Sequence, residues 1–139
     1  MDIRTFDLDR DYEAVRSLWE MCAPGIQISV TDDYDGLRHK LERDPQLFIV
    51  AVDDDKMIGS VIGGYDGRRG LVYHLAVLPD YRRRGIARRL METLEERFKA
   101  LGCYKYYLLV TRENAAALAF YRSFGCEPMD LHLLGKVIS

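Results

Sequence analysis

The chain of 139 residues contains no run of about 20 apolar residues, the length that a membrane-spanning helix requires. It opens Met1-Asp2-Ile3-Arg4 with no apolar signal region, so we expect a cytoplasmic protein without a membrane partner. Cysteine is scarce: Cys22, Cys103 and Cys126 lie far apart among apolar neighbours. An odd and scattered set argues against a disulfide framework and against a zinc site, so we expect no metal.

A large excess of charge is also missing, because 20 Lys and Arg face 22 Asp and Glu for a net charge of −2. The molecule as a whole is therefore not drawn to polyanions, and any basic character is local. The sequence has no internal repeat, low-complexity segment or linker. Its length fits one domain, which we expect to span residues 1–139.

Hydrophobic periodicity predicts strands and helices that alternate along the chain. Short apolar runs between polar turns indicate strands, and apolar residues recurring every three to four positions indicate helices. Strands are expected at residues 3–6, 47–52, 57–65, 71–77, 103–110 and 129–137. Helices are expected from Asp9 or Asp11 to about residue 22, from Asp32 or Asp33 to about residue 43, at 84–101, and from Asn114 to residue 124.

The resulting order, β-α-α-β-β-β-α-β-α-β, predicts an α+β or mixed α/β fold with helices packed on a central sheet. Three sequential strands between residues 47 and 77 are joined by short turns and indicate an antiparallel meander. The long helical connection before the strand at 103–110 indicates a parallel pair with the strand at 71–77. The tyrosines and leucines of 103–110 predict burial on both faces of that strand.

The segment Arg82-Arg83-Arg84-Gly85-Ile86-Ala87 joins the strand at 71–77 to the helix at 84–101. The first N–H groups of a helix have no partner within it and can bind an anion. A glycine lets the anion approach those donors, and the neighbouring arginines add positive charge. The segment therefore predicts a site for a phosphorylated cofactor. A nucleotide-hydrolase phosphate loop is excluded because its lysine and hydroxyl are absent, and a dinucleotide fold because the glycine lies in mid-chain.

Two blocks together resemble the GNAT superfamily of acyl-CoA-dependent N-acetyltransferases. The first runs from Leu75 to Ala87, and the second from Asn114 to Gly125 with the pattern Asn…Ala…Phe-Tyr…Phe-Gly. The pyrophosphate loop of the family has the form Arg/Gln-x-x-Gly-x-Gly/Ala, and Arg82, Gly85 and Ala87 occupy these places. The resemblance implies a GNAT-like domain with one splayed parallel strand pair, helices on both faces of the sheet, and direct transfer of an acetyl group from acetyl-CoA to a primary amine.

The resemblance also implies a role for each matching residue. Backbone groups of the strand end hold the pantetheine arm, the amides of the basic loop hold the pyrophosphate, and Asn114 contacts the cofactor arm. Tyr121 is the expected general acid, because a phenol with a pKa of ~10 can protonate a leaving thiolate of parent pKa ~8.5. The implied cofactor-binding residues are Leu75, Ala76, Val77, Arg82, Arg83, Arg84, Gly85, Ile86, Ala87, Asn114, Ala117 and Phe120.

The general base stays open at this point. Many family members place a glutamate on the third strand of the meander, where this chain offers Tyr73 and His74 instead. Strand alternation predicts that these two side chains face opposite sides of the sheet. His74 is the candidate base or water-relay member, since histidine exchanges protons near neutral pH, and a packed, hydrogen-bonded histidine is the alternative. Glu20, Asp32 and Asp33 are weaker candidates.

Acceptor specificity in the family comes from the first helix, the segment after it and the last strands. Asp32, Asp33 and Asp35 cluster there with Tyr34, which indicates either a cationic acceptor or simply a capped helix start. A polyamine, an aminoglycoside, a peptide N-terminus and a lysine side chain all remain open. The resemblance also implies a possible homodimer.

Two other classes compete with the enzyme. A catalytically silent acyl-CoA-binding module would keep the basic loop and lack proton chemistry, and the missing strand glutamate favours it. A nucleic-acid-binding module would use the arginines at 82–84, 88 and 89. The net charge and the acidic residues Glu92, Glu95 and Glu96 on the same helix argue against nucleic acid as a partner.

Overall fold

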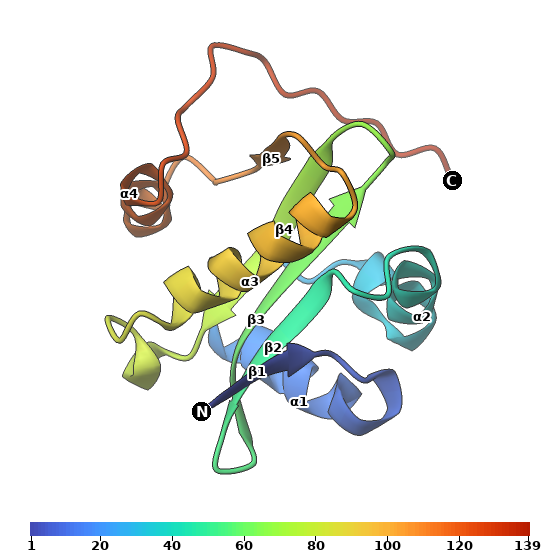
Figure 1. Ribbon diagram of the computed structural model, residues 1–139, viewed down its shortest axis with the longest axis vertical. Helices are drawn as coiled ribbons and strands as arrows, with labels where there is room; N and C mark the ends of the chain where they lie inside the picture. The colour runs from blue at the N-terminus through green and yellow to red at the C-terminus, as the bar shows by residue number, and fades with distance from the viewer. The chain divides into compact units, whose positions relative to one another are not determined.

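The computed structural model describes all of residues 1–139, which form two compact units, Met1–Leu109 and Val110–Ser139. The first unit holds the sheet and three of the helices (Figure 1). Its elements are β1 (Asp2–Thr5), α1 (Leu8–Met21), a 3-10 turn (Val30–Asp32), α2 (Tyr34–Arg43), β2 (Phe48–Asp53), β3 (Lys56–Tyr65), β4 (Gly70–Val77), a second 3-10 turn (Pro79–Tyr81), α3 (Ile86–Ala100) and β5 (Tyr106–Leu108). The second unit holds α4 (Ala115–Ser123).

The five strands lie in the order β1-β2-β3-β4-β5. Neighbouring strands from β1 to β4 are antiparallel, and β4 pairs with β5 in parallel. The predicted meander and the predicted parallel pair are both confirmed. The fold is therefore the mixed α/β fold that the order of elements indicated.

The core of the first unit lies on both faces of the sheet. Alternate residues of β3 face opposite ways: Ser60 bonds Trp19 of α1, whereas Gly59 faces Leu90 of α3. In Figure 1, α3 crosses in front of the strands and α1 passes behind them. The apolar faces of α1 and α3 and the central strands supply the fully buried side chains, among them Val15, Leu18, Trp19, Phe48, Ile49, Ile62, Leu90 and Leu94. Burial of such apolar area is the main stabilising term of the fold.

Three sequence predictions about these elements are wrong. The N-cap of α1 is Asp7, which accepts a hydrogen bond from the Arg10 N–H at 3.1 Å, and not Asp9 or Asp11. Asp11 is buried instead, and its carboxylate accepts hydrogen bonds from Nη1 and Nη2 of Arg4 at 2.7 and 2.9 Å. A carboxylate in the first turn can therefore serve a long-range ion pair, which spacing alone does not distinguish from a cap.

The other two errors concern strands. β5 has three residues, since its ladder with β4 has three pairs, and it is not buried on both faces: Tyr104 and Leu109 beside it are exposed. No strand forms at 129–137, where Leu131 and Leu134 are exposed. An apolar run becomes a strand only when a neighbouring strand completes its ladder, and the run itself carries no information about that partner.

The second unit confirms the predicted limits of the last helix. The Asn114 side chain caps α4 by accepting a hydrogen bond from the Ala117 N–H at 3.1 Å. Gly125 follows the helix with φ of 98°, as expected for a helix that ends at a glycine. In neither unit is there a helix with the length and apolar character needed to cross a membrane.

Candidate active site

The start of α3 has the geometry of an anion site. α3 has 15 residues, begins after Gly85, and has neither a side-chain cap nor an acidic residue in its first turn. Its first N–H groups have no acceptor within the helix, and the helix dipole places partial positive charge there. This end of the helix is therefore ready to accept negative charge.

The backbone before α3 alternates in conformation. φ is positive at Arg83 (63°) and at Gly85 (78°), while Arg84 between them and the helical Ile86 have negative φ. Alternation of this kind turns successive N–H groups toward one concave side, which is a recurrent anion-binding arrangement. Open space surrounds Gly85, because a Cβ built there would meet nothing within 4 Å. The loop can thus bring backbone donors directly against a ligand.

The arginine side chains of the loop make different contacts. Arg82 donates from Nε to the carbonyl oxygen of Val77 at 3.0 Å and so ties the loop to the end of β4. The guanidinium of Arg84 lies 5.0 Å from the ring centroid of Tyr81, within cation–π distance. Arg82, Arg83 and Arg84 are all exposed and keep the loop basic.

The edge of β4 that faces β5 is only partly paired. The parallel ladder runs from Gly70–Tyr106 to Val72–Leu108 and then ends, whereas β4 continues to Val77. Leu75, Ala76 and Val77 therefore have no ladder partner on that side, although Ala76 and Val77 pair with β3 on the other. An unpaired strand edge offers backbone donors and acceptors to an extended ligand.

β4 carries a bulge at His74, which corrects the predicted alternation. Ser60 and Ile62 of β3 pair with Ala76 and Tyr73, so two residues of β4 oppose one residue of β3. The φ of His74 is 53°, a conformation that few residues other than glycine adopt. An extra residue shifts the side-chain alternation, and Tyr73 and His74 therefore face the same side of the sheet.

His74 forms a short pair with Asp32, 42 positions away in the sequence. Nε2 of His74 lies 2.9 Å from Oδ2 of Asp32, whose backbone leads into α2. Burial alone would raise the pKa of Asp32, but hydrogen bonds from His74 and from the Ser29 N–H outweigh it and lower the pKa. Asp32 is therefore a carboxylate that fixes the ring of His74 and leaves Nδ1 as the nitrogen with no protein partner.

A chain of hydrogen bonds in the core supports the bulge at His74. The indole N–H of Trp19 donates to Oγ of Ser60 at 3.0 Å, and Ser60 donates to the carbonyl oxygen of His74 at 3.0 Å. Trp19 and Ser60 are fully buried. The ring of Trp19 also contacts the ring of His74, with 4.7 Å between centroids. The backbone of His74 is thus held in its unusual conformation from the core side.

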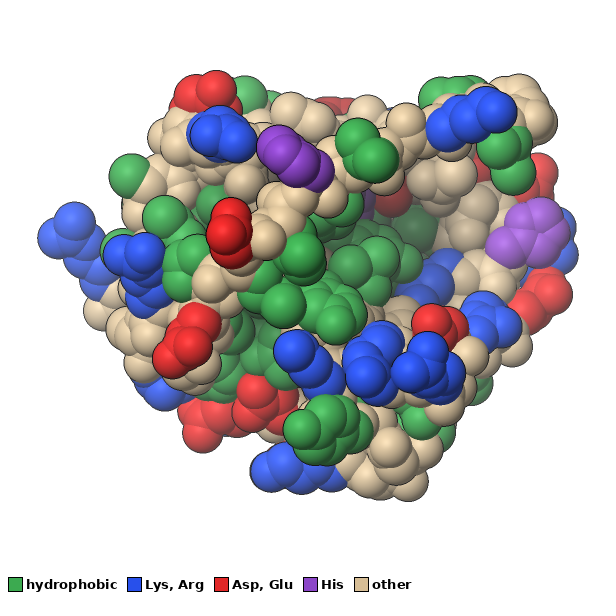
Figure 2. All heavy atoms as spheres, turned by 90° about the horizontal axis from the view of Figure 1, so that it is seen from above, with side chains coloured by type: hydrophobic (Ala, Val, Ile, Leu, Met, Phe, Trp, Pro, Cys, Tyr) green, Lys and Arg blue, Asp and Glu red, His purple; other side chains and the backbone are tan.

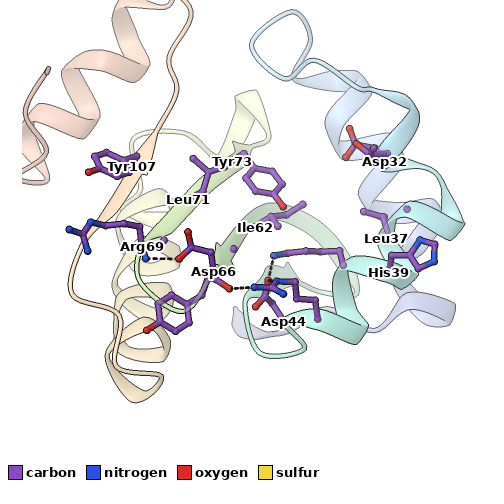
Figure 3. A pocket seen from close by; sticks show the side chains of 17 residues that line it. Asp32, Leu37, His39, Asp44, Ile62, Asp66, Arg69, Leu71, Tyr73 and Tyr107 are labelled. Carbon is purple, nitrogen blue, oxygen red and sulfur yellow. Dashed lines mark hydrogen bonds and ion pairs between the residues drawn. The ribbon is translucent and has the colours of Figure 1, made fainter. Parts of the chain in front are cut away.

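A pocket of about 720 Å³ opens beside Asp32, whereas His74 is not among the residues that line it. It runs along one face of α2, past Gly36, Lys40 and Arg43, and its opposite wall is the β3–β4 hairpin with residues such as Ile62 and Tyr73. Figure 3 shows Asp32 toward one end, Arg69 and Asp66 toward the other, and Tyr73 between them. A pocket of this size suits a small ligand or a few residues of a peptide.

The charged side chains in the middle of the pocket form an ion pair and cancel each other's charge. Nζ of Lys40 lies 2.7 Å from Oδ2 of Asp44, and both side chains are largely buried. Burial raises the pKa of Tyr73 to about 12, with Asp44 and Asp32 adding to the effect. Tyr73 therefore stays neutral at physiological pH and contributes apolar area and a hydroxyl group.

The acidic cluster predicted from the sequence does not line the pocket as a group. Of its members only Asp32 does. Asp33 caps α2 by accepting the Gly36 N–H at 2.7 Å, and Asp35 is exposed beside Arg38. Tyr34 donates its hydroxyl to Asp9 at 2.6 Å. The alternative of a capped helix start is thus correct for Asp33, and Glu20 is exposed away from the pocket lining.

The remaining predicted site residues lie on α4 in the second unit. Tyr121 is buried, its ring contacts that of Phe120 at 5.4 Å between centroids, and burial raises its pKa. Asn114 and Ala117 meet through the helix cap. The structure thus groups the predicted residues into two sets, 74–87 in the first unit and 114–121 in the second. That these sets form one site stays a prediction.

Sequence reasoning missed two features of the site. No sequence motif indicated the charged residues of the pocket, which are the Lys40–Asp44 pair and the arginines Arg43 and Arg69. The four-residue spacing of Lys40 and Asp44, which is typical of ion pairs on a helix, was the available signal. The bulge at His74 had no sequence signal, because a non-glycine residue occupies the positive φ position.

The chain belongs to the GNAT acetyltransferase family, because the model of the "Acetyltransferase (GNAT) family" matches residues 12–126. An acetyltransferase of Pectobacterium atrosepticum is 43% identical over 136 residues, which cover 98% of this chain and 94% of the relative. The protein is therefore an acetyltransferase of this family.

Solved structures share the fold at lower identity. The aminoglycoside N-acetyltransferase AAC(6')-Iy in complex with a bisubstrate analogue has a TM-score of 0.78 at 21% identity, covering 99% of this chain and 98% of that one. The PaiA N-acetyltransferase of Thermoplasma acidophilum in complex with coenzyme A has a TM-score of 0.76 at 22% identity, covering 94% and 92%.

Figure 2 shows Lys and Arg side chains in a row across the lower middle of one face, with acidic side chains beside them. A nucleic-acid-binding face concentrates Lys and Arg along one stripe. The acidic side chains beside this row and the net charge of −2 argue against the nucleic-acid alternative.

Proposed function

We propose that this protein transfers an acetyl group from acetyl-CoA directly to the primary amine of a small molecule or peptide, with both substrates bound together. The observation that carries the proposal is the loop at Arg83–Ile86, whose alternating φ and uncapped helix start suit a diphosphate. Two proteins with this fold were solved with coenzyme A or a bisubstrate analogue, which supports acyl-CoA as the donor.

The residues of the first unit fit such a donor. Backbone N–H groups of the loop would hold the diphosphate, since Gly85 leaves open space in front of them. The unpaired edge at Leu75–Val77 would hold the amide-bearing pantetheine arm as an added strand. Acetyl-CoA, when bound, supplies an acetyl group activated as a thioester. Asn114, Ala117 and Phe120 of α4 complete the proposed contacts.

His74 is the proposed general base. Its Nε2–H donates to Asp32, so Nδ1 carries the lone pair and accepts a proton from the attacking amine. Asp32 is a positioning residue: it holds the ring in one tautomer and stabilises the positive charge that the ring then acquires. The ring of His74 contacts the rings of Trp19 and Tyr73, and its partner Asp32 and its neighbour Tyr73 line the pocket.

Tyr121 is the proposed general acid. Its raised pKa, caused by burial, keeps the phenol protonated throughout the physiological range. The proton passes from the phenol to the sulfur of the departing thiolate as the carbon–sulfur bond breaks. The proposal also treats residues 1–139 as one domain in the cytoplasm, with a homodimer as the possible assembly.

The test is a panel of primary amines scored for release of free thiol from acetyl-CoA. We expect amine-dependent release, and we expect Gly85→Glu and Arg84→Glu to weaken binding of coenzyme A in calorimetry. Hydrolysis without an acceptor does not count as transfer. Coenzyme A binding without amine-dependent release would favour the catalytically silent module, and no binding at all would contradict the proposal.

A second test concerns the acid. Tyr121→Phe should lower the turnover rate about 100-fold, the lower end of the usual contribution of acid–base catalysis. Affinity for coenzyme A should be nearly unchanged. Tyr104→Phe, at an exposed position, is the matched control. Unchanged turnover with the preferred amine would exclude Tyr121 as the acid.

A further inference from the structure

The pocket beside α2 has charges of opposite sign at its two ends. Asp32, buried and bonded to His74, lies at the end where α2 begins. Arg43, the last residue of α2, and Arg69 of the β3–β4 hairpin line the other end, as Figure 3 shows for Arg69. Between them the Lys40–Asp44 pair cancels its own charge. The carboxylate of Asp32 therefore marks one end of the pocket and the two arginines mark the other. Arg16, which donates to the backbone carbonyl oxygen of Asp32 at 2.8 Å, reduces the negative charge at the first end.

The two arginines of the far end have unused hydrogen-bonding capacity. Arg43 donates to the carbonyl oxygen of Tyr65 at 2.9 Å, and its nearest carboxylate oxygen, on Asp44, is 3.9 Å away and already bonded to Lys40. Arg69 donates to the carbonyl oxygen of Arg68 at 3.2 Å, and its guanidinium lies 5.9 Å from the ring centroid of Tyr104, but it forms no ion pair. Each guanidinium carries five N–H donors, so most of them are available.

Asp66 reduces this positive charge without removing it. Its Oδ1 accepts the backbone N–H groups of Arg68 and Arg69 at 2.7 and 2.8 Å, which stabilise the turn of the hairpin. Two cationic residues, Arg43 and Arg69, thus accompany one anionic residue, Asp66, among the lining residues of this end. Arginine suits a carboxylate or a phosphate, which one guanidinium can bind through two parallel hydrogen bonds.

We infer that the acceptor is an elongated primary amine bearing an anionic group, with its amine at the Asp32 end of the pocket and its anionic group at the end lined by Arg43 and Arg69. This rests on the proposed function, whose acceptor site it defines more closely. Polyamines and aminoglycosides, which are cationic throughout, would meet like charge at the far end of the pocket.

The length of the pocket limits the acceptor. α2 has 10 residues, so the two ends of the pocket are separated by roughly 15 Å along its axis. Extended chains rise roughly 3.3 Å per residue, so a spacer equal to a few peptide units joins the two groups. The spacer contacts the apolar wall formed by Leu37, Ile62, Leu71 and Tyr73.

The test uses linear ω-amino carboxylates of increasing chain length as acceptors. Each is compared with its own carboxamide, with the ω-amino phosphate of the same length, and with a trimethylammonium analogue that holds no second acceptor amine. At the best length we expect kcat/KM for the carboxylate or the phosphate to exceed that of the carboxamide about tenfold, as one or two charge-assisted hydrogen bonds give. The more active of the two anions identifies the group.

Matched variants assign the effect to the two arginines. In the double variant Arg43→Gln, Arg69→Gln the ratio of anion to carboxamide should fall to about one. Because the ratio compares two acceptors on the same protein, a general loss of folded enzyme cancels. Arg38→Gln, on the same helix but paired with Asp35 and Glu42, should keep the wild-type ratio.

Calorimetry of the same compounds separates this inference from the proposed function. If no amine releases thiol but the anionic compounds bind about tenfold more tightly than the carboxamides, the proposed function fails and the assigned pocket stands. If thiol is released but the carboxamide or the trimethylammonium analogue is preferred at every length, the inference is overturned and the proposed function stands. Failure of both measurements rejects both.

Discussion

The loop before α3 and the pocket beside α2 lie in the same unit but are built in opposite ways. The loop is exposed, spans a few consecutive residues, and presents backbone N–H groups. The pocket and the His74–Asp32 pair beside it depend on side chains from distant parts of the sequence: His74 and Asp32 are 42 positions apart, and Trp19 and Ser60, which support His74, are 41. A ligand common to a family can be bound by backbone geometry, whereas the groups around an acceptor depend on the individual side chains.

This difference predicts two separate kinds of defect. Changes in the pocket should alter turnover while the affinity for coenzyme A stays constant. Changes in the loop should alter affinity for coenzyme A at constant fold. The predictions below test that separation, beginning with the largest expected effect.

His74→Asn should lower the turnover rate about 1000-fold, within the range of general acid–base catalysis, with little change in the affinity for coenzyme A. Asparagine tolerates the positive φ of this position better than most residues, so the bulge should persist. Steady-state kinetics and calorimetry give the two quantities. His132→Asn, at an exposed position, is the control. An equal loss of affinity for coenzyme A would contradict the prediction that changes in the pocket leave this affinity constant.

Gly85→Glu should lower the affinity for coenzyme A about 100-fold, because a carboxylate replaces the open space before the loop donors and charge-assisted hydrogen bonds are lost. Gly102→Glu is the matched control. Gly102 follows the other end of α3, has φ of 85°, and also faces open space. Both variants carry the same backbone strain, so only a specific anion site predicts different affinities. Equal affinities in calorimetry would contradict the site.

The sequence predicted the place of the loop and its glycine, but not the positive φ of Arg83. The contacts of the loop are local, and a strand, a glycine and an amphipathic helix that follow one another determine where the N–H groups point. The same holds for the cap at Asn114, whose bond to the Ala117 N–H spans three positions.

The pocket could not be predicted in the same way. Strand alternation placed Tyr73 and His74 on opposite faces, and one extra residue in β4 reversed that result. The neighbours Asp32 and Asp33 have the same chemistry and different roles: one pairs with a distant histidine and one caps α2. Only the tertiary structure distinguishes them.

Acid pH should affect the pocket and leave the loop unchanged. The pKa of Asp32 is lower in the folded protein than the ordinary value of about 3.9, so its stabilisation is present above about pH 4 and is lost as the pH falls through the lowered pKa. Asp32→Asn should lower the free energy of unfolding by about 2 kcal/mol at neutral pH, and the difference should shrink on acidification.

Denaturant unfolding at several pH values measures this effect. Asp35→Asn, at an exposed position in the first turn of α2, should change stability by less than about 0.5 kcal/mol. Arg84→Gln in the loop should likewise leave the acid dependence of stability as it is. A difference between Asp32→Asn and wild type that stays constant down to pH 2 would mean that the carboxylate is not stabilised by its pairing.

Arg83→Gly is expected to have the smallest effect and separates backbone from charge within the loop. Arg83 has φ of 63°, where a residue with a Cβ is strained by about 1 kcal/mol and glycine is not. Relief of that strain is partly offset by the greater freedom of glycine in the unfolded chain, so stability should rise by about 0.5 kcal/mol or less.

If backbone N–H groups hold the diphosphate, the affinity for coenzyme A should fall less than about threefold, because the positive φ is kept and one exposed charge is lost. A decrease as large as that of Gly85→Glu would show that the guanidinium of Arg83, and not the shape of the loop, supplies the binding energy. The contrast between a backbone-built loop and a side-chain-built pocket would then fail at the loop.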